Sequence, residues 1–235
     1  MKFALAGNPN CGKTTLFNSL TGSTAHVGNW PGVTVDKREG TYKKLPEKVA
    51  IVDLPGIYSL SPYTPEEIVS RNFILDENPD CIINIVDATN LERNLYLTTQ
   101  LLEIDVPVVV ALNMMDAVEQ NGDRVDAEAL SKALNVPVVP ISALRGTNTK
   151  ALMEQAYRAA HKPRKGSTVL SSGRLGGLVS DAEKELAKSG VKDPLFHAVK
   201  LVEADLLEVE RHPAAAAAVA ARKAKFDADE FGGDF

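Results

Sequence analysis

The chain has 235 residues, about one and a half times the length of a typical domain. Hydrophobic residues make up 44% and charged residues 24%, so the composition excludes a chain that is disordered as a whole. The net charge of −5 argues against a protein whose main task is to bind nucleic acid, because such proteins are usually basic.

Targeting and cross-linking signals are weak. No apolar run approaches the roughly 18 residues that cross a bilayer, and residues 7–9, Gly-Asn-Pro, interrupt the first apolar run too early for a signal peptide. The two cysteines, Cys11 and Cys81, have no His or Cys partner at metal-ligand spacing. We therefore expect no disulfide and no zinc site, and a reducing cytosol is the favoured compartment.

Apolar runs alternate with helical patterns over the first two thirds of the chain. The runs are continuously apolar, as parallel strands covered on both faces should be, at residues 3–6, 49–52, 81–86, 106–112 and 136–141. The helical patterns lie at residues 13–20, 65–75, 91–104, 127–134 and 149–160. Residues 34–42 are predicted to form an extra strand paired with 49–52 as a hairpin. This order predicts an α/β fold with a mostly parallel sheet flanked by helices.

The pattern changes after Ala160. Residues 162–168 and 171–173 are rich in helix breakers and predict a linker. Helices are predicted at 178–188, 195–209 and 214–225, the middle one with an apolar stripe at Phe196, Val199, Val202, Leu206 and Val209. Pro194 and Pro213 fit the first turns of two of them. The sequence thus predicts a domain at 1–165 and a small all-α helical subdomain at 166–235, with fraying from residue 227.

A glycine-rich motif joins the first predicted strand to the first predicted helix. Residues 7–14, Gly-Asn-Pro-Asn-Cys-Gly-Lys-Thr, fit the phosphate-loop pattern G-x-x-x-x-G-K-[ST]. In that setting backbone N–H groups surround phosphates, Lys13 reaches the β- and γ-phosphates, and the Thr14 hydroxyl binds magnesium. The flanking elements disfavour a chance glycine-rich turn. The residues expected at the nucleotide are Gly7, Asn8, Pro9, Asn10, Cys11, Gly12, Lys13, Thr14 and Thr15.

A second motif, Asp53-Leu54-Pro55-Gly56, ends the predicted strand 49–52. A carboxylate at the C-terminal end of a parallel strand faces the ligand crevice. We expect Asp53 to hold the water molecules around magnesium rather than the ion itself. The Gly56 N–H is expected to contact the γ-phosphate, with Leu54 and Pro55 beside the nucleotide.

A third motif, Asn113-Met114-Met115-Asp116, follows the strand 106–112. The N-x-x-D spacing lets Asp116 accept two hydrogen bonds from guanine, which adenine does not offer, so it predicts a GTPase rather than an ATPase. Asn113 and Met114 belong to the same predicted base site. Past the strand 136–141, the N–H groups of Ser142, Ala143 and Leu144 are expected to meet the guanine oxygen.

Residues 22–36 are the candidate first switch. They include Gly28, Trp30, Gly32 and Thr34, and Thr34 is the predicted second threonine on magnesium when GTP is bound. A tryptophan in such a loop is either a core residue or part of the moving segment. The sequence leaves both alternatives open.

Taken together, these motifs resemble a known family. Residues 7–15, 27–35, 53–56 and 113–116, with the run 58–67, look like the N-terminal cytosolic part of ferrous iron transport protein B. The resemblance is close to about Ala160 and looser beyond. It implies a Ras-like P-loop GTPase domain and a regulatory helical domain that acts on nucleotide release, like a GDP-dissociation inhibitor. It also implies a membrane portion for iron passage, absent from this chain, and a place at the cytoplasmic face of the bacterial inner membrane.

Two further residues bear on hydrolysis. Ile57 stands where Ras-like enzymes carry a water-positioning glutamine, and isoleucine cannot orient water. Asn10 resembles the asparagine of potassium-activated GTPases, in which switch-loop carbonyls complete a potassium site; here Gly28 and Trp30 would supply them. The predicted catalytic residues are therefore Lys13, Asn10, Thr34 and Gly56. Magnesium is the predicted cofactor, and potassium the predicted activator.

Other reactive residues receive weaker interpretations. Cys11 lies near a helix N-terminus, which favours its thiolate, although a small tolerated residue is the simpler interpretation. The histidines are scattered, and no chemistry is expected of His26, His161, His197 and His212. Glu66 and Glu67 begin a helix, where negative charge is favourable in any case.

The sequence thus predicts a GTP-binding and GTP-hydrolysing regulatory domain of a ferrous iron transporter. One alternative is a ribosome-assembly GTPase, which would need a basic extension where residues 166–235 are acidic in balance. Another is a nucleotide-gated binding module with incidental hydrolysis, which Ile57 permits. The predicted partners are GTP, GDP and the transmembrane portion of the same protein, without nucleic acid; a homo-oligomer is left open.

Overall fold

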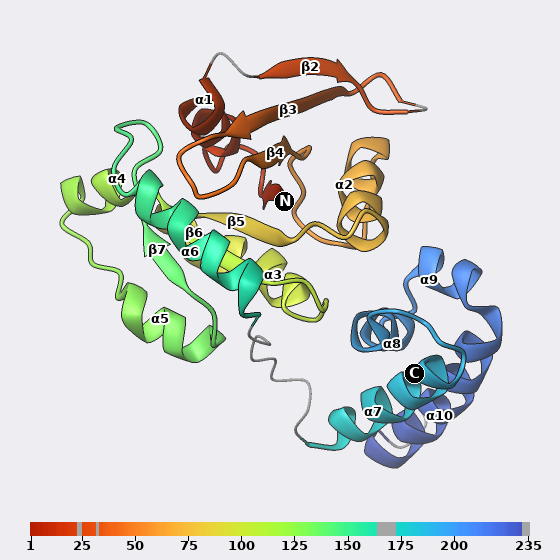
Figure 1. Ribbon diagram of the computed structural model, residues 1–235. Helices are drawn as coiled ribbons and strands as arrows, with labels where there is room; N and C mark the ends of the chain where they lie inside the picture. Colours follow the sequence, from red (N-terminus) through yellow and green to blue (C-terminus); the bar gives the residue numbers. More distant parts are fainter. Residues whose placement is uncertain (23–24, 32, 164–172, 232–235) are drawn as a thin grey trace. The chain divides into compact units, whose positions relative to one another are not determined.

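The chain divides into two units, Met1–Ser167 and Thr168–Phe235. The computed structural model describes residues 1–22, 25–31, 33–163 and 173–231 (Figure 1). The predicted domain boundary between residues 165 and 166, and the greater part of the predicted linker, lie outside the described residues. Each unit is therefore considered by itself.

The first unit is built on one seven-stranded sheet with the order β2-β3-β4-β1-β5-β6-β7. Strands β4, β1, β5, β6 and β7 run parallel, while β3 is antiparallel to both β4 and β2. The mostly parallel sheet and the hairpin of β3 with β4 are confirmed. The strands are β1 (Lys2–Gly7), β2 (His26–Asn29), β3 (Asp36–Tyr42), β4 (Val49–Asp53), β5 (Cys81–Asp87), β6 (Val108–Asn113) and β7 (Val138–Pro140).

Helices connect the strands. They are α1 (Lys13–Thr21), α2 (Pro65–Asp76), α3 (Leu91–Leu101), α4 (Met115–Gln120), α5 (Ala127–Leu134) and α6 (Thr149–His161), with a short 3-10 turn at Ala88–Asn90. Every helix predicted for this unit is found, although α3 ends at Leu101 rather than at residue 104. Strand β2 and helix α4 were not predicted. Helix α2 begins at Pro65, as predicted. Thr64 and Glu67 form a capping box there, and Pro65 occupies the first turn.

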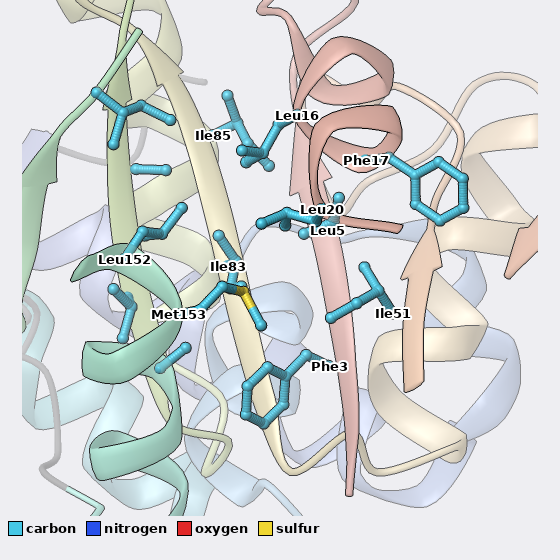
Figure 2. Close-up of a cluster of buried hydrophobic side chains, with 14 of the residues drawn as sticks. Phe3, Leu5, Leu16, Phe17, Leu20, Ile51, Ile83, Ile85, Leu152 and Met153 are labelled. Atoms are coloured by element: carbon cyan, nitrogen blue, oxygen red, sulfur yellow. The ribbon is translucent and has the colours of Figure 1, made fainter. Parts of the chain in front are cut away.

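The main core of this unit lies between the sheet and two helices. Leu16, Phe17 and Leu20 of α1 and Leu152 and Met153 of α6 pack on the side chains of β1, β4 and β5 (Figure 2). Because successive strand residues point to opposite faces, the intervening buried residues of these strands, Ala4, Val52 and Ile82, face the other side. Buried side chains of α2 and α3 provide further core, among them Ile74 and Leu97. The continuous apolar strands are thus explained by a sheet covered on both faces.

The second unit contains helices only among its described residues. They are α7 (Gly173–Lys188), α8 (Pro194–Val202), α9 (Leu206–Arg211) and α10 (Pro213–Phe231). Their core is formed by apolar residues of α7 and α8 with one from α10: Leu178, Val179, Ala182, Leu186, Ala198, Val199, Leu201, Val202 and Val219. The all-α character of this part is confirmed, and Pro194 and Pro213 occupy the predicted first turns.

The single helix predicted at 195–209 is wrong, because the chain breaks between α8 and α9. Ala204 has φ +57°, and the N–H groups of Ala204 and Asp205 donate to Leu201 and Lys200, which is the Schellman pattern of a helix end. Asp205 then caps α9 by accepting from the N–H of Glu208. As a result Leu206, predicted on the apolar stripe, is 78% exposed.

The fraying predicted from residue 227 stays a prediction; the described chain is helical as far as residue 231, because α10 continues through Phe231. An ion pair one turn apart, Lys223 Nζ to Asp227 Oδ2 at 3.0 Å, supports this last part of the helix. Residues 232–235 lie outside the described residues.

Candidate functional site

The phosphate-loop motif encloses a hollow at the N-terminus of α1. The loop bends through Asn10 at φ +65° and Gly12 at φ +90°, and α1 has no side-chain cap, so the N–H groups of its first turn are free of a capping side chain. A Cβ at Gly12 would collide with the Asn113 amide. The hollow has a volume of about 600 Å³ and is lined by Asn8, Pro9, Asn10, Gly12, Lys13, Thr14, Thr15, Pro55, Gly56 and Glu66. Such a helix N-terminus favours anions, phosphate above all.

A buried charge pair lies at the base of this hollow. Lys13 Nζ lies 3.0 Å from Asp53 Oδ1, and the Thr14 hydroxyl donates to Asp53 Oδ2 at 3.0 Å. The side chains of Lys13 and Asp53 are only 10% and 4% exposed. The sheet brings the phosphate loop and Asp53 together, because β1 and β4 are parallel neighbours that end side by side.

The donors of this group fit magnesium. A threonine hydroxyl and a carboxylate are hard oxygen ligands, which Mg²⁺ prefers, and it commonly keeps several waters beside them. Thr14 and Asp53 are therefore the residues that would hold the ion and its water. Thr34, the other predicted ligand, is exposed in a bend and does not line the hollow.

Asn113 ties the phosphate loop to the loop that follows β7. Its Nδ2 donates to the Cys11 carbonyl at 2.8 Å, and its Oδ1 accepts from the Ala143 N–H at 2.9 Å. The side chain is buried, so the loss of either hydrogen bond would leave a buried polar group without a partner. The first two predicted motifs and the base-site motif are thus brought to one end of the sheet.

The base-site residues are only partly arranged as expected. Asp116 stands on α4, whose start at Met114 has φ +63°, and its Oδ2 lies 3.2 Å from Arg145 Nε. The Ala143 N–H, expected to be free for guanine, is bonded to Asn113 here. Ser142 is buried, with its Oγ accepting from the Arg145 N–H at 3.2 Å, and Leu144 is 83% exposed.

The candidate switch lies apart from the hollow in this structure. Gly28 is in β2 and pairs with Lys37 of β3, so it does not line the hollow as a potassium carbonyl would. The Trp30 carbonyl accepts from the Val33 N–H at 3.3 Å. The described residues therefore do not assemble the predicted potassium site. Gly32 lies outside them.

Trp30 itself is buried, at 8% exposed. Its ring meets Phe73 of α2 edge-on at 5.5 Å, and the Lys37 ammonium lies 5.2 Å from its centroid. Its indole Nε1 is buried with no hydrogen-bond partner among the described residues. Of the two alternatives, this structure shows the packed one.

The residues after Asp53 lie against the phosphate loop. Leu54 is buried, and a Cβ on Gly56 would come within 3.1 Å of Pro9 backbone atoms, which explains a glycine there. Ile57 is fully buried, and its N–H donates to the Gly7 carbonyl at 3.1 Å. The sequence predicts that Ile57 does not position water, and its burial agrees with that prediction.

One expectation about the phosphate loop needs correction. Burial raises the pKa of the Cys11 thiol to about 11, outweighing the lowering effect of Lys13, so the thiolate is disfavoured.

Asn8 joins the phosphate loop to α3. It is 3% exposed and donates from Nδ2 to the Arg93 carbonyl at 3.3 Å.

Glu66 also lines the hollow, although it was not predicted as a site residue. It lines the hollow opposite the phosphate loop, whereas the neighbouring Glu67 is engaged in the capping box of α2. A second hollow of about 560 Å³ is lined by residues such as Pro107, Pro137 and Arg158 and contains none of the predicted site residues.

Comparison with known proteins finds relatives of this chain among iron transport proteins. The family model for ferrous iron transport protein B matches residues 1–156. The Fe(2+) transporter FeoB of Salmonella typhimurium is 50% identical over 156 residues, which are 65% of this chain and 20% of that protein. The chain spans about a fifth of the length of the curated relatives it matches most strongly.

Solved structures of related proteins match this chain over nearly its whole length. The N-terminal domain of FeoB from S. thermophilus, bound to GDP, AlF4⁻ and K⁺, has a TM-score of 0.88 and 41% identity, covering 100% of this chain and 92% of that one. The cytosolic domain of FeoB from L. pneumophila has a TM-score of 0.85 and 38% identity, covering 99% and 91%. The Ras-like fold is thereby confirmed. None of the described helices has the length and apolar character to span a membrane.

Proposed function

The chain belongs to the ferrous iron transport protein B family, with the GTPase domain of that family as its first unit, and we propose that it binds GTP and hydrolyses it to GDP and phosphate. The observation that carries this is the group at the base of the hollow, where Asp53 contacts both Lys13 and Thr14. A cation, a hydroxyl and a carboxylate lie together beside the phosphate loop, which supports a site there for the triphosphate and its magnesium.

The proposal assigns roles to Lys13, Thr14 and Gly56, which line the hollow, and to Asp53 and Thr34. The free N–H groups of α1 bind the phosphate oxygens, and Lys13 turns from Asp53 to the β- and γ-phosphates when nucleotide enters. Thr14 and Asp53 would hold magnesium and its water, which would supply positive charge to the phosphates. The Gly56 N–H meets the γ-phosphate from the other side of the loop, and Thr34 joins only when GTP is bound.

Recognition of the base falls to Asp116 in this proposal. A buried or half-buried carboxylate accepts from the N1–H and amino groups of guanine and is left unpaired by adenine, which gives specificity. The side chain is 19% exposed, so it is accessible to a base. Asn113 connects the phosphate loop to the loop after β7 through its hydrogen bonds with Cys11 and Ala143.

Potassium is proposed as the activator. The S. thermophilus relative was solved with K⁺, and Asn10 lines the hollow of this chain. To reach such an ion, the Trp30 carbonyl would have to leave its hydrogen bond with the Val33 N–H, and Gly28 would have to leave its place in β2.

The wider role is part of the same proposal. The relatives are Fe(2+) transporters several times longer than this chain, so we infer that it is the cytoplasmic regulatory part of a ferrous iron transporter at the bacterial inner membrane. The second unit is proposed to influence nucleotide release, and the predicted partner is the membrane portion. A ribosome-assembly GTPase is disfavoured by this family membership.

Single-turnover hydrolysis of GTP tests the enzyme. We expect hydrolysis with magnesium in the parent and its loss in Lys13→Ala, with Lys132→Ala, an exposed lysine on α5, as the matched control. Rates in potassium should exceed those in sodium, and Asn10→Ala should remove that difference while GDP still binds. Equal rates in both salts would disprove potassium activation, and no hydrolysis by the parent in either salt would leave the nucleotide-gated binding module.

A further inference from the structure

The second unit contains a cluster of two imidazoles and one carboxylate that the proposed GTPase does not use. His197 Nδ1 lies 2.6 Å from Glu208 Oε2, and His212 Nε2 lies 3.7 Å from the same oxygen. The three atoms all lie within 4.8 Å of one another. Among the described residues, this is the one group of three or more His, Cys, Asp or Glu side chains so placed.

The helix break at Ala204 creates this cluster. His197 is on α8, Glu208 is on α9, and His212 follows the last residue of α9. In one continuous helix, residues 197 and 208 would be separated by about 16 Å along the axis. The turn at Ala204 brings them into contact instead, and Glu208 and His212 share a face because they are four residues apart.

The cluster lies in the interior of the second unit. Glu208 is fully buried and His197 is 5% exposed. The Nε2 atom of His212 is buried and makes no hydrogen bond to the described residues, yet it faces the carboxylate. A cation between the three side chains would pair with the carboxylate and also use the lone pair of that nitrogen.

An ion also needs a path to the cluster. The His212 side chain is 17% exposed, so the cluster has one side close to solvent.

We propose that His197, Glu208 and His212 form a binding site for a divalent first-row transition metal ion of the Fe²⁺ or Zn²⁺ type. Two histidines and one carboxylate with open positions are the ligands of many non-haem Fe²⁺ sites, and also suit Zn²⁺. Tetrahedral ligands at about 2.1 Å lie about 3.4 Å apart. The 3.7 Å separation already fits, and the 2.6 Å hydrogen bond has to open by less than about 1 Å.

The competing explanation is a hydrogen-bonded network that only joins α8 to α9. It accounts for the contact between His197 and Glu208, but it leaves His212 Nε2 without a hydrogen bond. The metal proposal does not depend on the GTPase proposal, because the three ligands belong to the second unit. The two can therefore fail separately.

Metal titration of the whole chain tests the site. The phosphate loop is first filled with GDP and excess Mg²⁺, and Co²⁺, Zn²⁺ and, without oxygen, Fe²⁺ are then titrated by calorimetry, with the visible spectrum of Co²⁺ as a second readout. We expect one ion per chain. Glu208→Gln and His212→Gln should each weaken binding more than about tenfold, since losing even a group that only orients a ligand costs about 10–100-fold. His161→Gln, an exposed histidine of the first unit, is the matched control.

Two results would overturn the proposal. The first is that none of the three ions binds to the parent. The second is that the affinity is unchanged in both Glu208→Gln and His212→Gln. If the variants fail to fold by circular dichroism, the side-chain ¹⁵N signals of the parent decide. Zn²⁺ should shift the signals of His197 and His212 and leave those of His26 and His161 in place, and unchanged signals for His197 and His212 would disprove the site.

Discussion

The guanidinium of Arg145 lies against the carboxylate of Asp116, with Nε 3.2 Å from Oδ2. Asp116 is the proposed acceptor for guanine, so the base and Arg145 compete for the same oxygens. Arg145 is 57% exposed and can swing into solvent, whereas Asp116 is held by α4. Base binding therefore includes the cost of breaking this ion pair.

Removing Arg145 should strengthen nucleotide binding. An exposed ion pair contributes about 0–1 kcal/mol, so Arg145→Gln is expected to lower the Kd for GDP by up to about fivefold, measured by equilibrium titration. Arg124→Gln, at another exposed arginine, should leave the Kd unchanged. Weaker binding by Arg145→Gln would show that the arginine helps to hold the nucleotide.

Changing Asp116 should change the preferred base. Asp116→Asn replaces an acceptor by an amide that can donate to the C2 carbonyl of xanthine, so GTP affinity should fall by at least about 100-fold while XTP binds. Competition titration of the two nucleotides measures this. Asp123→Asn, at an exposed aspartate, is the control. Parent-like GTP affinity in Asp116→Asn would place the base elsewhere.

Trp30 should report the state of the switch. It is the single tryptophan of the chain and is packed on Phe73. If Thr34 moves to magnesium when GTP binds, Trp30 loses this environment, so its fluorescence should differ between GDP and a non-hydrolysable GTP analogue. Thr34→Ala should remove the difference and keep the GDP affinity within about twofold, since Thr34 does not line the hollow. Identical parent spectra, with binding verified, would make Trp30 a core residue in both states.

Cys11 should be unreactive, and its effect on stability should depend on pH. Burial raises the pKa of the thiol from 9.0 to about 11, so the folded state retains the proton longer than the unfolded state. The stabilising contribution is therefore complete below about pH 9 and is lost as the pH rises to about 11, amounting to about 2–3 kcal/mol.

Comparison of the parent with Cys11→Ala in urea unfolding at pH 8 and pH 10.5 isolates this contribution. Iodoacetamide at pH 8 should label Cys11 only in the unfolded chain. Rapid labelling of the folded chain would mean that the thiolate is accessible.

The first unit was largely predictable because its strands are continuously apolar and its motifs follow them directly. Two of the failures, at α4 and at the break between α8 and α9, occurred where the backbone takes a left-handed conformation at a residue other than glycine. Met114 begins α4 in this way, and Ala204 ends α8. Neither residue type signals positive φ. The capping residue Asp205, three positions before Glu208, was the available sign of a new helix.

The site was less predictable than the fold. Motif spacing brought Lys13, Thr14 and Asp53 together correctly, because parallel strands end at one edge. Spacing could not show that the Ala143 N–H is bonded to Asn113, nor that His197 and His212 meet at Glu208. These contacts depend on loop conformation and on the helix break.

The pairing of Lys13 with Asp53 bears on how nucleotide is exchanged. A lysine buried in a phosphate loop would carry an uncompensated charge once the phosphates leave, and the empty protein would then be unstable. Here Asp53 takes over as counter-ion at 3.0 Å. The chain therefore supplies its own counter-ion for the buried Lys13 ammonium, and this compensation does not depend on phosphate.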